Sequence, residues 1–262
     1  MRVILKLEAK VSVSQKEAYE KYYSSTNAWF YNKVPSLHDF NGIKHFCFSN
    51  LIGVKNEKIK EGKKYSVIFS FSNSDIAYKF VTSLELGEII TLGELKFSLF
   101  STKFDKIDVN QGDILETPTI IVVEENLNNK NNKYKKKSID YLKEPNKYLE
   151  LLEKNILHKY NNLTKNNSKK FILNTNLFKN INISPITYNK NIKFDKGQNK
   201  GHFAIPIIRK KSSNSIIPFY GNKLRFTIGE INDKQKDILN TVIDSGFGIH
   251  NSYGMGFIIK KK

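Results

Sequence analysis

The hydrophobic positions in the first half of the chain alternate in short runs, which is the pattern of half-buried β-strands. At the N-terminus, Val3, Leu5 and Leu7 alternate with charged or solvent-tolerant neighbours. Three later runs are also typical of strands, at residues 44–52, 65–71 and 94–104, and the last two alternate. We therefore expect strands at these four places.

Two helices are predicted between these strands. Ser14 and Glu17 have the spacing of a capping box, which opens a helix that runs toward Pro35. Three residues of this helix are expected to face the core: Ala18, Tyr22 and Trp29. A second helix is expected over residues 74–86. The resulting order β, α, β, β, α, β is that of a ferredoxin-like unit.

The same order recurs in the second half of the chain. Strands are expected at residues 119–123, 171–173, 186–194, 203–209, 223–228 and 257–259, and helices at residues 146–160 and 233–245. Residues 126–137 are mostly Asn and Lys, so we expect a solvated loop near a domain junction. The order predicts an α+β protein of two tandem ferredoxin-like (RRM-like) domains, over residues 1–117 and 118–262.

The charge of the chain is strongly positive. Lys and Arg number 43 against 25 Asp and Glu, which gives a net charge of +18. Such a charge favours a polyanionic partner, and its attraction to phosphates would hold for any RNA or DNA. Coding bias is the alternative explanation, because the chain is rich in Lys, Asn and Ile throughout.

The single cysteine, Cys47, excludes an intramolecular disulfide and a cysteine-based zinc cluster. It stands between Phe46 and Phe48, which predicts a buried, unreactive thiol. No apolar stretch is long enough to cross a bilayer, and the N-terminus has the pattern of a strand rather than a signal peptide. We expect a cytoplasmic protein with no membrane partner.

A glycine-rich segment near the C-terminus has the most distinctive pattern. Gly246 and Gly248 form one Gly-x-Gly pair, and Gly254 and Gly256 form another. Glycine lacks Cβ, so such a loop can take positive φ and let a phosphate come close to its backbone N–H groups. The segment follows a predicted helix and precedes a strand, which is the reverse of the dinucleotide-binding fingerprint. The alternative is a helix cap at Gly246 followed by an ordinary hairpin.

This pattern resembles the glycine-rich loop of the repeat-associated RNA-binding (RAMP) superfamily of CRISPR proteins. Within it, the chain is most similar to the endoribonucleases that cut precursor CRISPR RNA. The resemblance implies tandem ferredoxin-like domains and CRISPR repeat RNA as the partner. It also implies that the loop binds RNA through seven residues: Gly246, Gly248, His250, Asn251, Ser252, Gly254 and Gly256.

The candidate chemistry needs neither a metal nor a cofactor. None of the five histidines has H-E-x-x-H spacing, and no carboxylate cluster suggests a two-metal centre. RNA can instead be cleaved when a base takes the proton of the ribose 2′-OH and an acid protonates the leaving 5′ oxygen. Histidine suits both proton transfers, and lysine suits stabilisation of the charged phosphorane.

The resemblance places this chemistry after the first helix. The repeat-processing nucleases have a tyrosine late in that helix, a histidine in the following segment and a lysine before the next strand. The matching residues are Tyr31, His38 and Lys44, although the connection from tyrosine to histidine is short here. His38 is then the principal acid or base, Tyr31 its partner and Lys44 the phosphorane stabiliser. His45 is the second candidate histidine, and packing at the helix end is the alternative role of Tyr31.

Further RNA contacts are expected from cations in the second half. Arginine is scarce in this chain, and its planar guanidinium binds phosphate and stacks on bases. The candidates are Arg209, Lys210, Lys211, Lys223 and Arg225. The lysine runs at residues 133–137 and 260–262 are better explained as solvated surface.

Two other functions stay open. One is a non-cleaving RNA-binding subunit of a CRISPR effector complex. The other is a general RNA-binding protein with two RRM-like domains, although no strand carries the signature of the first RNA-binding motif. The sequence leaves open whether the protein is a monomer or a homodimer.

Overall fold

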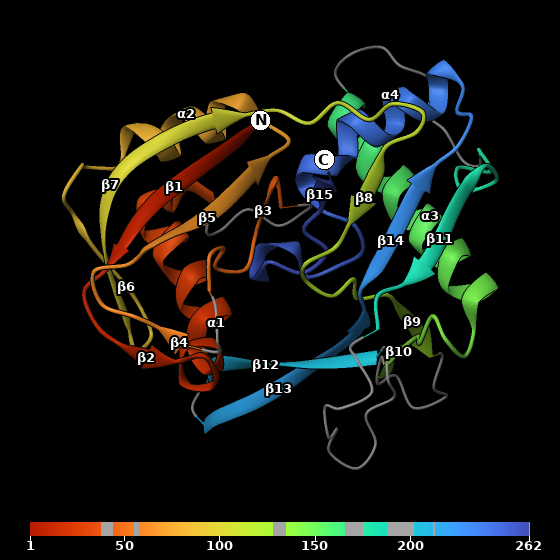
Figure 1. Ribbon diagram of the computed structural model, residues 1–262. Helices are drawn as coiled ribbons and strands as arrows, with labels where there is room; N and C mark the ends of the chain where they lie inside the picture. Colours follow the sequence, from red (N-terminus) through yellow and green to blue (C-terminus); the bar gives the residue numbers. More distant parts are fainter. Residues whose placement is uncertain are drawn as a thin grey trace. The chain divides into compact units, whose positions relative to one another are not determined.

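The fold comes from a computed structural model, which describes residues 1–37, 44–54, 58–127, 135–165, 175–187, 202–211 and 213–261 (Figure 1). The chain divides into two compact units. The N-terminal unit contains residues 1–106, 206–218 and 252–254. The C-terminal unit contains residues 107–205, 219–251 and 255–262.

The N-terminal unit has the ferredoxin-like order of elements. Its principal elements are β1 (Arg2–Ala9), α1 (Gln15–Lys33), β3 (Phe46–Phe48), β5 (Lys64–Phe71), α2 (Ser74–Thr82) and β7 (Leu95–Asp105). Strand β6 (Ile89–Leu92) pairs with β7 at one edge, so the antiparallel sheet has the order β3-β5-β1-β7-β6. The remaining elements are a pair of short strands, β2 (Val13–Ser14) and β4 (Lys58–Ile59), and the 3-10 helix η1 (Pro35–Leu37).

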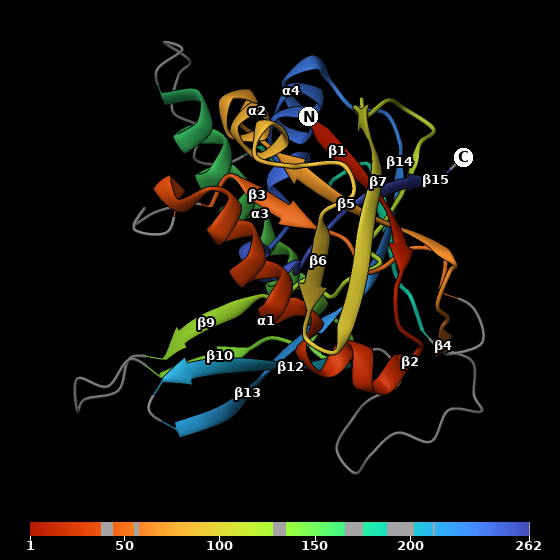
Figure 2. The ribbon, with the colours of Figure 1, turned by 90° about the vertical axis from the view of Figure 1, so that its left-hand side faces the viewer.

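Both helices of this unit pack on the same face of the sheet (Figure 2). Phe30 of α1 stacks on Phe46 of β3, with ring centres 3.9 Å apart, and lies 5.7 Å from Phe69 of β5. Phe80 of α2 lies 4.8 Å from Phe69 and 5.5 Å from Phe71. All five rings are fully buried, so this aromatic cluster is the centre of the core.

Three tyrosines of α1 hold the segment that follows β3. The hydroxyls of Tyr19 and Tyr22 donate to the carbonyl oxygens of Leu51 and Ser49, at 3.3 and 2.8 Å. The hydroxyl of Tyr23 donates to Asn50 Oδ1 at 2.6 Å. Side chains of α1 thus bind residues 49–51, and β3 covers only three residues of the strand that was predicted over residues 44–52.

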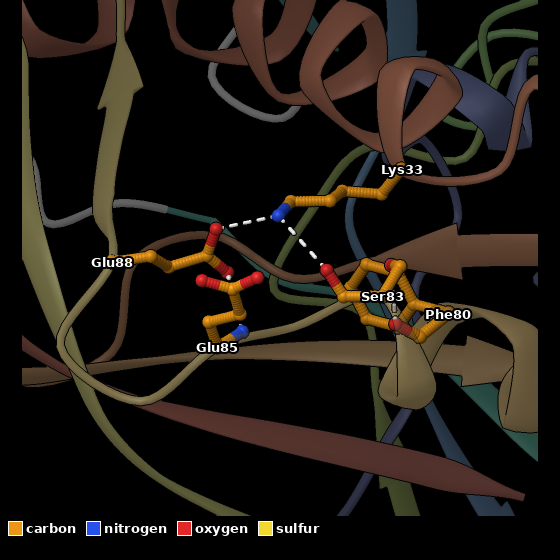
Figure 3. Close-up of polar contacts among 5 residues, drawn as sticks. All are labelled: Lys33, Phe80, Ser83, Glu85 and Glu88. Carbon is orange, nitrogen blue, oxygen red and sulfur yellow. Dashed lines mark hydrogen bonds and ion pairs between the residues drawn. The ribbon is translucent and has the colours of Figure 1, made fainter.

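The C-terminal end of α1 is fixed by Lys33 (Figure 3). Lys33 Nζ lies 2.5 Å from Glu88 Oε2 and donates to the carbonyl oxygen of Ser83 at 3.0 Å. Ser83 is the C-cap of α2, and Gly87 has φ of +87° in the turn that follows. The predicted helix over residues 74–86 was therefore too long, because this turn leads the chain into β6.

The C-terminal unit repeats the arrangement. Its principal elements are β8 (Ile114–Glu116), α3 (Pro145–Thr164), β11 (Ile181–Pro185), β14 (Leu224–Ile228), α4 (Asp233–Val242) and β15 (Ile259–Lys261). The antiparallel sheet has the order β11-β14-β8-β15, which corresponds strand for strand to β3-β5-β1-β7 of the other unit. The hairpin of β9 (Glu124–Leu127) and β10 (Lys135–Ser138) and the short 3-10 helix η3 (Ile243–Ser245) also belong to this unit. A second hairpin, β12 (His202–Lys211) with β13 (Ser213–Asn222), and the 3-10 helix η4 (Asn251–Tyr253) are divided between the two units, because residues 206–218 and 252–254 are assigned to the N-terminal one.

Several predictions for this half need correction. The first sheet strand is β8, whereas residues 119–123 contribute only isolated bridges, Ile121 to Asn222 and Val122 to Ile249. All of Ile120–Val123 is buried, which explains why the run is apolar. A buried segment need not belong to a sheet, so the apolar pattern did not identify a strand here. The last strand begins at Ile259 rather than Phe257 for the same reason, since Phe257 and Ile258 are fully buried.

Other predictions fall partly outside the described residues. The expected strand at residues 171–173 lies outside them, as does most of the one at residues 186–194, while β11 ends at Pro185. The described parts of the expected loop at residues 126–137 form the ends of the β9–β10 hairpin. Strand β8 lies before the expected domain boundary at residue 117, yet it pairs within the C-terminal sheet.

Helices α3 and α4 contact each other through a short hydrogen bond from the Tyr160 hydroxyl to Asp237 Oδ2, 2.5 Å long. On α3, the buried Tyr148 hydroxyl donates to the carbonyl oxygen of Ile121 at 3.0 Å. Within the described ranges, neither these helices nor those of the other unit are long and apolar enough to cross a membrane.

The aromatic cluster predicts a large effect of Phe30→Ala. Truncating this buried ring removes its packing against two strands and α2, so the free energy of unfolding should fall by about 3–5 kcal/mol. Tyr78→Ala is the control, because Tyr78 is 59% exposed on α2, and surface changes usually stay within about 0.5 kcal/mol. Urea unfolding followed by circular dichroism measures both. Equal losses in the two variants would contradict this description of the core.

Candidate active site and glycine-rich loop

The structure brings together two of the three candidate catalytic residues. Tyr31 lies in the last turn of α1, and Lys44 comes two residues before β3. Lys44 Nζ lies 5.7 Å from the centre of the Tyr31 ring, within the range of a cation–π contact. Phe46 meets the same ring edge-on at 5.7 Å. His38 lies outside the described residues, in the segment that joins Tyr31 to Lys44.

The environment of the Tyr31 hydroxyl favours its protonated form. Burial raises the pKa of Tyr31, and a hydrogen bond with the Ser252 side chain lowers it only in part. The neighbouring Tyr253 raises the pKa further. A phenol with a raised pKa stays neutral at pH 7, so Tyr31 can donate a proton or a hydrogen bond there.

The tip of the glycine-rich segment, residues 252–254, belongs to the N-terminal unit and packs beside Tyr31. Asn27 Nδ2, one turn earlier on α1, donates to the carbonyl oxygen of Ser252 at 2.5 Å. A Cβ on Gly254 would lie 2.8 Å from the Phe48 ring, so only glycine fits against β3. Asn27 is not among the residues predicted from the sequence, although it is a polar residue four positions before Tyr31 on the same helical face.

His45, the second candidate histidine, is half-buried, and this burial lowers its pKa. Its carbonyl oxygen accepts from the Ser72 backbone N–H at 3.0 Å, and Ser72 Oγ lies 3.5 Å from His45 Nδ1. A lowered pKa keeps the imidazole neutral at pH 7, so His45 stays a candidate base but is a weaker candidate acid.

The four glycines of the loop all have positive φ, between +69° and +77°. A Cβ on Gly248 would lie 2.5 Å from the carbonyl oxygen of Val122, and one on Gly256 would overlap that of Phe247. At Gly248 and Gly256 the loop therefore needs glycine because the backbone of the protein occupies the Cβ positions. Gly246 also caps η3, through its N–H to the carbonyl oxygen of Ile243 at 3.3 Å.

Two residues between the glycine pairs, His250 and Asn251, make specific contacts within the protein. His250 has φ of +61°, and its ring stacks on Phe219 at 3.9 Å. His250 Nε2 lies 3.3 Å from Glu124 Oε1, and this hydrogen bond is the main reason that the pKa of Glu124 is lowered. Asn251 is only 7% exposed, and its Nδ2 donates to the carbonyl oxygens of Phe247 and Met255 at 3.2 and 2.8 Å.

The candidate RNA-binding cations lie on β12, on β14 and at the residue between β13 and β14. Arg225, on β14, makes an ion pair with Glu116, with Nη2 and Oε1 2.7 Å apart, and Lys261 Nζ lies 3.1 Å from Oε2 of the same carboxylate. Burial raises the pKa of Glu116, but hydrogen bonds from Arg225 and Lys261 outweigh it and leave the pKa lowered. Lys223 Nζ lies 5.6 Å from the centre of the Phe203 ring.

The other three cations, Arg209, Lys210 and Lys211, are the last three residues of β12.

Among the residues that the structure describes, no group of three or more His, Cys, Asp or Glu side chains could hold a metal ion.

Residues 105–259 match the family described as "CRISPR associated protein Cas6, C-terminal". Because this match covers more than half of the 262-residue chain, the protein belongs to the Cas6 family. The family expected from the glycine-rich segment is thereby confirmed. No curated protein sequence matches the chain.

Several solved structures share the fold over the whole chain. A CRISPR associated protein Cas6 is 19% identical, with a TM-score of 0.68, and the match covers 100% of this chain and 99% of that one. A protein from a Cas6-related gene of Pyrococcus furiosus is 20% identical, with a TM-score of 0.66 and coverage of 100% and 98%. "An RAMP protein binding different RNA substrates" is 17% identical, with a TM-score of 0.68 and complete coverage of both chains. The two tandem ferredoxin-like domains are confirmed.

The close packing of the loop predicts that Gly256→Ala is more harmful than Gly112→Ala. Both glycines have positive φ, so either substitution adds strain of about 1–3 kcal/mol. Only at Gly256 does the new Cβ meet backbone, whereas nothing lies within 4 Å at Gly112. The overlap should lower the free energy of unfolding by a further ~1–3 kcal/mol in urea titrations. Similar losses in both variants would mean that φ alone selects glycine in the loop.

Proposed function

We propose that the protein is a metal-independent endoribonuclease that cuts CRISPR repeat RNA in the precursor transcript. The observation that carries this proposal is the arrangement in the N-terminal unit. Lys44 Nζ lies over the Tyr31 ring, the Tyr31 hydroxyl is hydrogen-bonded with Ser252 at the loop tip, and in the sequence His38 stands between Tyr31 and Lys44. A protonated phenol and an ammonium group close to each other are what general acid catalysis and phosphorane stabilisation require.

In this mechanism the ribose 2′-OH loses its proton to a base and attacks the adjacent phosphorus. A bond to the 5′ oxygen breaks, and that oxygen takes a proton from an acid. The products are a 2′,3′-cyclic phosphate (or 3′-phosphate) and a 5′-hydroxyl. We assign His38 as the principal acid or base, Tyr31 as the group that positions or exchanges a proton, and Lys44 as the cation that stabilises the phosphorane.

The proposal of RNA as the ligand is supported by charge and by relatives. The chain carries a net charge of +18, which would attract RNA whatever its nucleotide sequence. One structure with the same fold is described as "An RAMP protein binding different RNA substrates". Another, 11% identical with a TM-score of 0.53, is a Cas6 product complex.

We also propose a division of labour within the chain. Residues 1–117 would carry the chemistry, and residues 118–262 would bind RNA through the glycine-rich loop and the cations Arg209, Lys210, Lys211, Lys223 and Arg225. Because Arg225 already pairs with Glu116, phosphate would have to compete with a carboxylate for this guanidinium. A non-cleaving RNA-binding role in a CRISPR effector complex is the alternative function.

The sharpest test of the proposal is His38→Ala in single-turnover cleavage of repeat RNA. Loss of a general acid or base should slow cleavage by about 10²–10⁴-fold. RNA affinity, measured by filter binding, should stay within about threefold, since the positive field that dominates binding is intact. His158→Ala is the matched control, because His158 is an exposed histidine on α3.

Cleavage at the wild-type rate by His38→Ala would remove His38 from the mechanism and make His45→Ala the next variant to measure. RNA binding without any cleavage by the wild-type protein would instead support the non-cleaving alternative.

A further inference from the structure

The glycine-rich loop is built around a buried lysine. Lys159, on α3, is only 3% exposed. Its Nζ donates three short hydrogen bonds, to the carbonyl oxygens of Gly246 and Gly248 at 2.6 and 2.7 Å and to Asn251 Oδ1 at 2.6 Å. A neutral amine has only two N–H groups, so three acceptors require the charged ammonium form.

A charged lysine in this position has a high free-energy cost. Its neighbours on α3, Ile156, Leu157 and Tyr160, are all buried members of the core of this unit. Lysine is almost never fully buried, because desolvation of the ammonium is unfavourable unless every N–H finds an acceptor. An apolar side chain would suit the surroundings, so the three oxygens of the loop are the specific reason for lysine here.

Asn251 extends the effect of this ammonium over the whole loop. Its Oδ1 accepts from Lys159, while its Nδ2 donates to the carbonyl oxygens of Phe247 and Met255. One carbonyl lies within the first Gly-x-Gly pair and the other within the second. Both pairs are thus tied, directly or through one amide, to a single positive charge.

The backbone between these ties is fixed as well. The N–H of Phe247 donates to the carbonyl oxygen of Gly256 at 2.9 Å, and that of Ile249 to Val122 at 3.0 Å. His250 follows with φ of +61° and its ring against Phe219. The inward carbonyls therefore belong to the same rigid arrangement that sets the direction of the His250 side chain.

We propose that Lys159 is a positioning residue for RNA binding, whose buried ammonium orders the glycine-rich loop from beneath. This inference rests on the proposed function of the loop. The ammonium acts in two ways: it turns the carbonyl oxygens of the loop inward, and it adds a fixed positive charge under a surface that would receive phosphates. Both effects favour an anionic ligand before it arrives, so less ordering is needed on binding.

The test compares Lys159→Met with Tyr148→Phe in the full-length protein. Methionine keeps the length of the side chain and removes the charge and three donors. Tyr148→Phe is matched, because Tyr148 is a buried residue of the same helix that donates to a carbonyl oxygen, that of Ile121, outside the loop. Both variants lose buried hydrogen bonding, but only one of them touches the loop oxygens.

Two measurements are made where both variants are fully folded. Hydrogen exchange of the amides of Phe247, Ile249 and Gly256 should become at least ~10-fold faster in Lys159→Met than in Tyr148→Phe. The affinity for repeat RNA should fall at least ~10-fold further in Lys159→Met, and its salt dependence should flatten by about 0.7 for each phosphate that the variant no longer neutralises. A variant that was only less stable would keep the wild-type salt slope.

Unchanged exchange of the loop in Lys159→Met would overturn the proposal. Faster exchange with the affinity and salt slope of Tyr148→Phe would also overturn it, because the lysine would then serve stability alone. If Lys159→Met does not fold, Asn251→Ala replaces it, and the same loosening and weaker binding are required. Failure of the proposed function is distinguishable, because the wild-type protein itself would then not bind repeat RNA, whatever the exchange data show.

Discussion

The glycine-rich loop depends on the close approach of two backbones. Gly248 lies against the carbonyl oxygen of Val122, and Gly256 against that of Phe247, at distances that leave no room for a Cβ. Positive φ at all four loop glycines makes this approach possible. The backbone N–H of Ile249 and that of Gly256 then donate to carbonyl oxygens of the buried run at residues 120–123, although neither segment belongs to a sheet.

The same constraint explains why a polar group is buried under the loop. The carbonyl oxygens of Gly246 and Gly248 face the interior, where an unsatisfied acceptor would cost about 1–3 kcal/mol each. Lys159 supplies the donors for both of these oxygens, and Asn251 supplies those for the carbonyl oxygens of Phe247 and Met255. In the N-terminal unit the loop tip at Ser252 meets Asn27 and Tyr31 in a similar way, with a side-chain amide satisfying a backbone carbonyl.

Local signals allowed much of the fold to be predicted from the sequence. The capping box of Ser14 and Glu17 depends only on neighbours along the chain, and it forms as expected at the start of α1. Strand β8 was missed because three residues are too few to show alternation, and their partners Arg225 and Ile259 lie far along the chain. The apolar run at residues 119–123 has the composition of a strand without being one, because sequence shows burial more clearly than pairing.

The candidate site was predictable to a lesser degree. The resemblance identified Tyr31 and Lys44, but their proximity follows from the pairing of β3 with β5, which no local pattern reveals. Lys159 could not have been found, because a lysine among 43 basic residues gives no sign that it is buried. Its position on α3, between apolar residues, becomes informative only when the loop oxygens are in place.

We propose that this chain cleaves RNA without a metal ion. The most direct measurement incubates the wild-type protein with repeat RNA in excess EDTA and determines the chemistry of the new ends. Our account predicts cleavage at an undiminished rate, with a 2′,3′-cyclic phosphate or 3′-phosphate on one fragment and a 5′-hydroxyl on the other. Loss of cleavage with the chelator and recovery with Mg²⁺, or products with a 5′-phosphate, would contradict it.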